Sequence, residues 1–199
     1  AKWYAADAED SAAVEQVFAT VEEQVGPVIG YAHCVGSILV KSAHQVTDDE
    51  WHHTIRRNLD SAFYALRSAV KRMQKRKAGS LVFVSTGAAW GLPAHEPIAA
   101  AKAGIEGLVR SAAASYASRG LRVNAVAPGM METPMATPII GSETGRKFSE
   151  AMHPVGRVGK ADEVASLMAW LLSDDATWVS GQTYSIDGGL RHLKSRPKM

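Results

Sequence analysis

The sequence contains little of what marks several classes of protein. Cys34 is the single cysteine in 199 residues, so an intramolecular disulfide is excluded and a reducing, cytoplasmic setting is expected. No apolar run approaches the roughly 18 residues that a membrane span needs, and no secretory signal opens the chain. The formal net charge is +2, which is too small to indicate nucleic acid or a membrane surface as the main partner. These absences favour a globular domain of ordinary composition, long enough to bury one core.

The histidines do not form a metal-binding pattern. His52 and His53 are neighbours on a predicted helix and would face different ways, so they cannot share an ion as a pair four residues apart could. His153 precedes Pro154 in an irregular region. No metal site is therefore expected.

Helical and strand patterns alternate along the chain. The predicted elements follow in the order strand 2–6, a helix between Ser11 and Gly26, strand 28–33, helix 48–75, strand 81–84, helix 98–118, strand 121–127, helix 161–172 and strand 183–186. Such alternation is typical of parallel βαβ units in a doubly wound sheet. We therefore expect a single α/β domain over residues 1–199, ending in a solvated basic tail at 191–199.

The helix predicted over 48–75 is the longest. Thr47 and Glu50 form a capping box at its start. Its predicted inward stripe consists of Trp51, Ile55, Leu59, Phe63, Leu66, Val70 and Met73.

The most informative stretch is 81–108. Its strand ends in Ser85, a loop rich in glycine and proline follows, and the next helix carries Lys102. This stretch resembles the active-site segment of the short-chain dehydrogenase/reductase family, which has a Ser after the strand and Tyr-x-x-x-Lys on the helix. The position of that Tyr, four residues before Lys102, is held by Ile98, which cannot donate or accept a proton. The resemblance implies an atypical NAD(P)-dependent oxidoreductase with impaired or altered catalysis.

Further motifs carry the same resemblance in the same order. They are Asp7-Ala8, the turn from Ala32 to Gly36, Asn58, Pro128-Gly129 with Thr133, and Asp187-Gly188-Gly189. In the turn that ends at Gly36, only that glycine matches the family's Asn-Asn-Ala-Gly. The resemblance implies a Rossmann-like fold and an NAD or NADP site formed by Asp7 at the adenine, Lys102 at the ribose, Pro128, Gly129 and Thr133 at the carboxamide, and Gly36.

The resemblance also implies catalytic roles. Ser85 would orient the substrate oxygen, Asn58 would anchor a water relay, and Lys102 would retain ribose binding. Without this resemblance, each residue also has a purely structural interpretation. Ser85 would be a polar residue at the end of a strand, Lys102 would be a solvated helix residue, and Asn58 would be a buried amide that bonds to the backbone.

His95 is the candidate replacement for the missing acid. It precedes Ile98 by three residues, and histidine is the side chain that ordinarily exchanges a proton near neutral pH, so it can serve as a proton donor. The alternative is a loop histidine that lies in water or caps the helix.

The family's glycine-rich pyrophosphate turn, part of a first βαβ unit, has no counterpart before Asp7. Either the natural gene encodes this half beyond the given chain, which we favour, or strand 2–6 pairs with strand 28–33 through a right-handed crossover. Without the turn we expect weak dinucleotide binding. In the first case strand 28–33 becomes an exposed edge.

Two interpretations stay open for the remaining features. Met130, Met131, Met135 and Met152 indicate either an adaptable apolar pocket or core packing, and Cys34 is expected to pack as a small hydrophobe.

The leading function is an oxidoreductase for a small carbonyl or alcohol substrate. The alternative is a non-catalytic scaffold or partner subunit, because helices 48–75 and 98–118 resemble those through which family members form dimers and tetramers. A homo-oligomer is expected in both cases.

Overall fold

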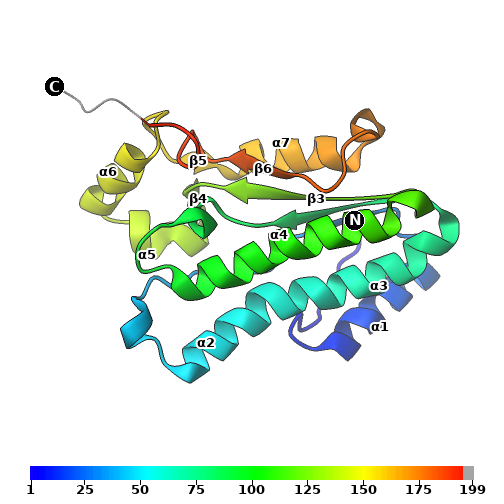
Figure 1. Cartoon of the computed structure of the whole chain (residues 1–199). Coiled ribbons are helices and arrows are strands. Elements are labelled where there is room, and N and C mark those ends of the chain that lie inside the picture. Colours follow the sequence, from blue (N-terminus) through cyan, green and yellow to red (C-terminus); the bar gives the residue numbers. More distant parts are fainter. Residues whose placement is uncertain (195–199) are drawn as a thin grey trace.

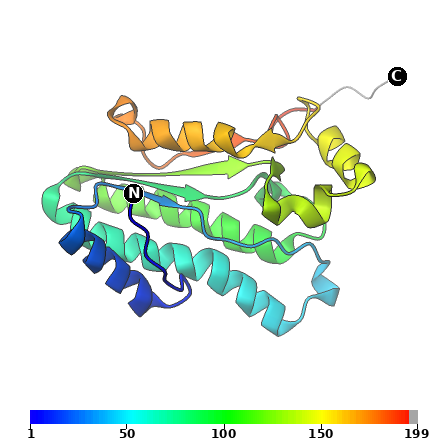
Figure 2. The ribbon, with the colours of Figure 1, turned by 180° about the vertical axis from the view of Figure 1, so that it is seen from behind.

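The computed structural model describes residues 1–194 and has three layers (Figure 1). The central layer is a parallel sheet in the order β1-β2-β3-β6, built from β1 Gly30–His33, β2 Gly79–Val84, β3 Leu121–Pro128 and β6 Thr183–Ile186. Helices α1 (Ser11–Gln24), α3 (Ser61–Arg76) and α4 (Glu96–Tyr116) cover one face of the sheet, and α7 (Ala161–Leu172) covers the other, as both views show (Figures 1 and 2). The predicted parallel α/β architecture is confirmed.

The larger helical layer contains α1 Ser11–Gln24, α2 Asp48–Ile55, α3 Ser61–Arg76 and α4 Glu96–Tyr116. A π-helical turn, Arg56–Asp60, joins α2 to α3 without a break, which confirms the long helix predicted over 48–75. The capping box of Thr47 and Glu50 is present. Between this layer and the sheet lies the main core, which includes Phe18, Leu66, Met73, Leu81, Phe83, Ile105, Val109 and Val123.

The inward stripe predicted for the long helix is wrong at its first half. Trp51 and Phe63 are 39% and 43% exposed. The buried positions there are instead Thr54, Asn58 and Ala62. The long helix approaches α4 so closely here that only small and polar side chains fit between the two helices. Leu59, for example, packs against Gly104, and a Cβ added to Gly104 would lie 3.0 Å from the Leu59 side chain.

On the other face of the sheet, α7 Ala161–Leu172 packs Met168 and Leu171 against Val82 and Val126. The remaining elements were not predicted. The elements β4 Met131–Glu132, β5 Gly159–Lys160, α5 Thr137–Ile140 and α6 Glu143–Met152 lie over the carboxyl ends of the strands, with short helical turns at Ala43–Gln45, Gly87–Trp90 and Pro134–Ala136. Two further turns, Ala117–Arg119 and Asp174–Ala176, lie near the amino ends of the strands.

The strand predicted at 2–6 does not form. Lys2 Nζ and Tyr4 Oη instead bond to Gln24 at the end of α1, so the segment runs beside that helix. The less favoured alternative, in which this strand pairs with β1, is therefore wrong, and β1 is an edge strand of the sheet that residues 1–194 form. An apolar run such as 28–33 predicts a buried strand, but only His33 of β1 is buried, because β1 lies at the edge of the sheet.

The basic tail begins with a residue whose side chain is buried. The Arg191 side chain is 5% exposed and pairs with Glu106, which corrects the prediction of a solvated tail at this position. Residues 195–199 of that tail lie outside the described residues. Within residues 1–194, no helix has the length and apolar character needed to span a bilayer.

Candidate active site

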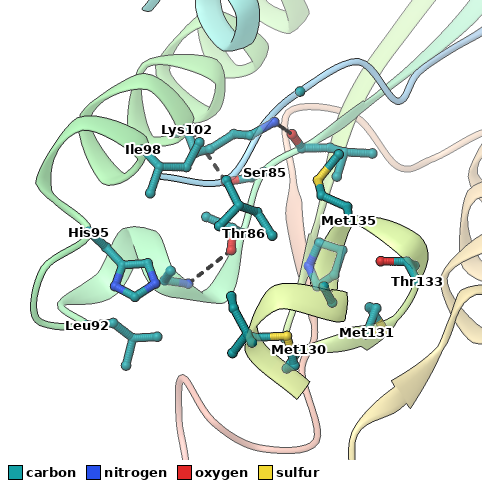
Figure 3. Close-up of a pocket in the computed structure, with 18 of the residues that line it drawn as sticks. Ser85, Thr86, Leu92, His95, Ile98, Lys102, Met130, Met131, Thr133 and Met135 are labelled. Carbon is teal, nitrogen blue, oxygen red and sulfur yellow. Dashed lines mark hydrogen bonds between the residues drawn. The ribbon is translucent and has the colours of Figure 1, made fainter. Parts of the chain in front are cut away.

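A cavity of about 210 Å³ lies where β1, β2 and β3 end (Figure 3). It is lined by the turn after β1 (Cys34 to Ile38), by Ser85 and Thr86 after β2, and by Pro128 to Met131 after β3. Helix α4 and the segment from β4 to α6 complete its wall. Ligand sites in doubly wound sheets occupy this edge, because all parallel strands end there.

Lys102 and Ile98 lie one helical turn apart on α4 and line the same cavity (Figure 3). Lys102 is 6% exposed, and its Nζ donates to the carbonyl oxygen of Val84 at 2.9 Å. Burial lowers the pKa of this amine to about 8, because removal from water penalises the charged form. Ile98 is 4% exposed and presents only carbon to the cavity.

Ser85 also lines the cavity, but its hydroxyl is engaged elsewhere. Its Oγ donates to Glu106 Oε1 at 2.9 Å, and Arg191 pairs with the other oxygen of that carboxylate at 3.4 Å. Sequence reasoning missed Glu106 and Arg191. The available signal was the spacing, because Glu106 follows Lys102 by four residues and so shares its face of the helix.

Asn58 is fully buried in the π-helical turn and fastens the loop after β1. Its Nδ2 donates to Ser37 Oγ at 2.9 Å, and its Oδ1 accepts from Ser37 N at 3.1 Å. A Cβ on Gly36 would lie 2.9 Å from Asn58 Oδ1 and 3.1 Å from Lys102 Nζ. Glycine at this position therefore lets the loop approach both side chains.

His95 lies at the start of α4 and lines the cavity near Ile98 (Figure 3). It is half-buried, and its Nδ1 donates to Pro93 O at 2.7 Å, so Nε2 is the ring nitrogen left for a ligand or water. Asp7, by contrast, is exposed, accepts from Glu9 N, and is not part of the cavity wall. The structure thus brings together every predicted site residue except Asp7.

His153 is a site residue that sequence reasoning did not assign. It is 3% exposed, accepts from Met130 N at 3.0 Å through Nε2, and donates to Ser149 O at 2.6 Å through Nδ1. A Cβ on Gly129 would lie 2.6 Å from His153 Nε2. This histidine holds the turn after β3 through Met130, and its second partner, Ser149, belongs to α6, whose position could not be inferred from local sequence.

The four methionines of the predicted apolar pocket all line the cavity, and Met130, Met131 and Met135 face it from the side opposite α4 (Figure 3). Cys34 also contributes to the wall, but it is exposed, which corrects the expectation that it packs as a small hydrophobe. Among residues 1–194, no group of three or more His, Cys, Asp and Glu is arranged to hold a metal ion.

The wall is compatible with the nicotinamide and ribose end of a dinucleotide. Lys102 Nζ makes one hydrogen bond within residues 1–194, so further N–H groups remain for ribose hydroxyls. The Thr133 hydroxyl and the backbone at Gly129 can meet a carboxamide, and apolar side chains can flank a ring. The described residues contain no glycine-rich turn for a pyrophosphate.

Comparison with known proteins agrees with this geometry. The family model described as enoyl-(acyl carrier protein) reductase matches residues 1–191. The chain is 35% identical over 182 residues to 3-oxoacyl-(acyl-carrier-protein) reductase FabG of Salmonella typhimurium, covering 91% of this chain and 74% of that protein. It is 32% identical over 195 residues to 2-(S)-hydroxypropyl-CoM dehydrogenase 3 of Xanthobacter autotrophicus, covering 96% of this chain and 76% of that one.

A solved structure shares the same architecture. Gluconate 5-dehydrogenase from Burkholderia cenocepacia, in complex with NADP and tartrate, superposes with a TM-score of 0.90 at 26% identity, covering 94% of this chain and 74% of that one. The order of the strands, the position of the cavity and these similarities lead to one conclusion: the chain belongs to the short-chain dehydrogenase/reductase family, whose members are oxidoreductases.

Proposed function

We propose that this chain is an NAD(P)-dependent oxidoreductase for a small carbonyl or alcohol substrate, with proton transfer impaired by the isoleucine in its active site. One observation carries the proposal. Ile98 lines the cavity one turn before Lys102, where a helix-borne acid would meet the substrate oxygen. The rest of the wall keeps polar groups suited to a nicotinamide nucleoside.

Each residue has a proposed task. Lys102 would donate to the ribose, while Thr133, Pro128 and Gly129 would hold the carboxamide. A bound nicotinamide would supply or accept the hydride. Asn58 would keep the loop after β1 in place, because both ends of its amide bond Ser37.

His95 is the proposed source of the proton in the residual reaction. Its Nε2 is free of protein partners within residues 1–194, whereas both ring nitrogens of His153 are engaged. Ser85 would contribute to substrate orientation only after its hydroxyl turns from Glu106, which is a further reason to expect slow turnover.

The test of this function is the variant Ile98→Tyr, with Ile98→Phe as the matched control. Tyrosine beside Lys102 restores a proton donor, whereas phenylalanine adds the same ring without the hydroxyl. Oxidation of NADPH and NADH should be followed with a panel of aldehydes and ketones. We expect kcat to rise roughly 10²- to 10⁴-fold in the tyrosine variant alone, the range that general acid catalysis supplies.

Equal rates in the tyrosine and phenylalanine variants would contradict the proposal, because the hydroxyl would then have no role. A cofactor titration of both variants accompanies the assay. It separates loss of nucleotide binding from loss of chemistry.

The alternative is a non-catalytic partner subunit in a homo-oligomer. Its supporting observation is the pair of exposed aromatic side chains on the outer helical layer, Trp51 and Phe63. An assembly that forms without binding either dinucleotide would favour this alternative. Dinucleotide binding in the assembled form would favour the oxidoreductase.

A further inference from the structure

The group beside the Lys102 amine that can become an anion is the Cys34 thiol, whose negative charge would favour the ammonium form. Burial raises the pKa of that thiol and so disfavours the anion. Cys34 and His33 face the amine from the end of β1, and Asn58 faces it from the long helix. Glu106 lies on the same helix as Lys102, but its carboxylate is taken by Ser85 and Arg191. No carboxylate among residues 1–194 forms an ion pair with Nζ.

The hydrogen bonding suits a neutral amine. An ammonium group has three N–H donors, whereas the described surroundings give Nζ one acceptor, the carbonyl oxygen of Val84. A neutral amine can donate to Val84 O and still keep a lone pair for a ligand. Burial acts in the same direction, because it lowers the pKa of Lys102 to about 8.

The cavity gives a small apolar carbonyl compound access to this amine. Its volume of about 210 Å³ is below the range of drug-sized pockets, and methionine side chains form much of the wall. Ile98 leaves no hydroxyl group on α4 that would hydrogen-bond Nζ or compete for the carbonyl oxygen. Neutral lysines in such apolar pockets act as nucleophiles toward carbonyl groups.

We propose that Lys102 is a nucleophile that condenses reversibly with small apolar aldehydes and ketones to form an imine at Nζ. The lone pair of the neutral amine forms a bond to the carbonyl carbon, and the carbonyl oxygen gains the proton that Nζ gives up. Departure of that oxygen as water, with loss of the second amine proton, leaves a C=N bond. One amine and one carbonyl yield one imine and one water, so no oxidant or reductant takes part.

This activity goes beyond the proposed dehydrogenase function and does not depend on it. The condensation needs no nicotinamide. A dinucleotide whose ribose bonds Lys102 would compete with it.

The experiment is reductive trapping of the whole chain without nucleotide, using hexanal and sodium cyanoborohydride at pH 7.5, followed by peptide mapping by mass spectrometry. Lys147, an exposed lysine on α6 with 72% of its side chain accessible, is the internal reference. We expect Lys102 to be labelled roughly 10- to 100-fold faster than Lys147, because a far larger fraction of its amine is neutral at this pH. The rate at Lys102 should rise with pH to a plateau with a midpoint near 8.

Two variants sharpen the result. Lys102→Met should abolish the fast label, and Lys147→Met should leave it unchanged. Labelling of Lys102 at or below the rate of Lys147, or a midpoint above 10, would overturn the proposal even if the methionine variant fails to fold. If Ile98→Tyr gains reductase activity while Lys102 of the parent chain is not labelled, the imine proposal alone fails.

Discussion

His33 shows at the scale of one residue how this fold controls protonation. It is 1% exposed at the end of β1, beside the rings of Tyr31 and Phe83. Tyr31 Oη donates to Nδ1 at 2.9 Å, and Nε2 donates to Ser61 Oγ at 3.2 Å, because that hydroxyl gives its own proton to Arg57 O. The neutral ring is thus satisfied, and burial lowers its pKa to about 4, with a smaller contribution from Lys102.

His33 should make the protein less stable as the pH falls. In the unfolded chain this ring takes up a proton near its ordinary pKa of 6.5, whereas the folded chain resists protonation down to about pH 4. Stability attributable to the neutral ring is therefore present above pH 6.5 and is lost between pH 6.5 and 4. The loss should reach about 2 kcal/mol at pH 5.

The measurement is urea unfolding of the parent chain and of His33→Asn at pH 7 and pH 5. The asparagine variant cannot titrate, so its stability should change less between the two pH values. An equal change in both proteins would show that His33 is not the group responsible.

At the scale of elements, two joints organise the active site. The π-helical turn directs Asn58 inward, where its amide fastens the loop that carries Gly36. The pair of Glu106 and Arg191 fastens the segment after β6 to α4, and the Arg191 guanidinium also lies 3.5 Å from the ring centre of Trp90. Both joints connect the wall of the cavity to segments remote in sequence.

The joint between α4 and the last segment should be costly to break. Arg191→Met removes the cation and leaves the buried Glu106 carboxylate without its partner, so we expect a loss of about 3–5 kcal/mol in the free energy of unfolding. Lys194→Met is the matched control, because Lys194 lies in the same segment but is exposed. A loss below about 1 kcal/mol, similar to the control, would show that water reaches Glu106 and that the joint contributes little.

At the scale of the whole molecule, the outer helical layer carries an aromatic patch formed by Phe63 and Tyr64, whose ring centres are 6.2 Å apart. Phe63 is 43% exposed, and the guanidinium of Arg67 lies 5.4 Å from its ring centre and 5.5 Å from that of Tyr64. A patch that can meet its own copy across a two-fold axis fits the homo-oligomer proposed above.

Phe63→Glu should disrupt this assembly. Near a two-fold axis the substitution places two like charges close together in a dehydrated contact, which should weaken association at least about 10-fold. Light scattering across a concentration series measures the change in mass. Phe148→Glu is the control, because Phe148 is an exposed phenylalanine, 67% accessible, on α6. Unchanged mass in the Phe63 variant would exclude the patch as the interface.

Much of this fold follows from local pattern. The capping box at Thr47 and Glu50, the helix predicted over 161–172 and the strand over 183–186 all appear at the expected places. Caps and periodicity depend on residues a few positions apart, so they can be read from the chain alone. The spacing of Ser85, Ile98 and Lys102 likewise indicated that they lie close together. One loop connects the end of the strand that precedes Ser85 to the helix that carries Ile98 and Lys102, and all three residues line the cavity.

The tertiary structure decided what depends on distant partners. The amino acids at 2–6 suited a strand, but Gln24 at the end of α1 holds them beside that helix. Arg191 was expected to lie in a solvated tail, but its side chain is buried and pairs with the Glu106 carboxylate on α4. His153 has no local motif, yet it holds the turn after β3 because α6 supplies its other hydrogen bond. In each case the decisive contact joins residues 20 or more positions apart, or it involves an element that no local pattern predicts. Only the folded chain brings such residues together.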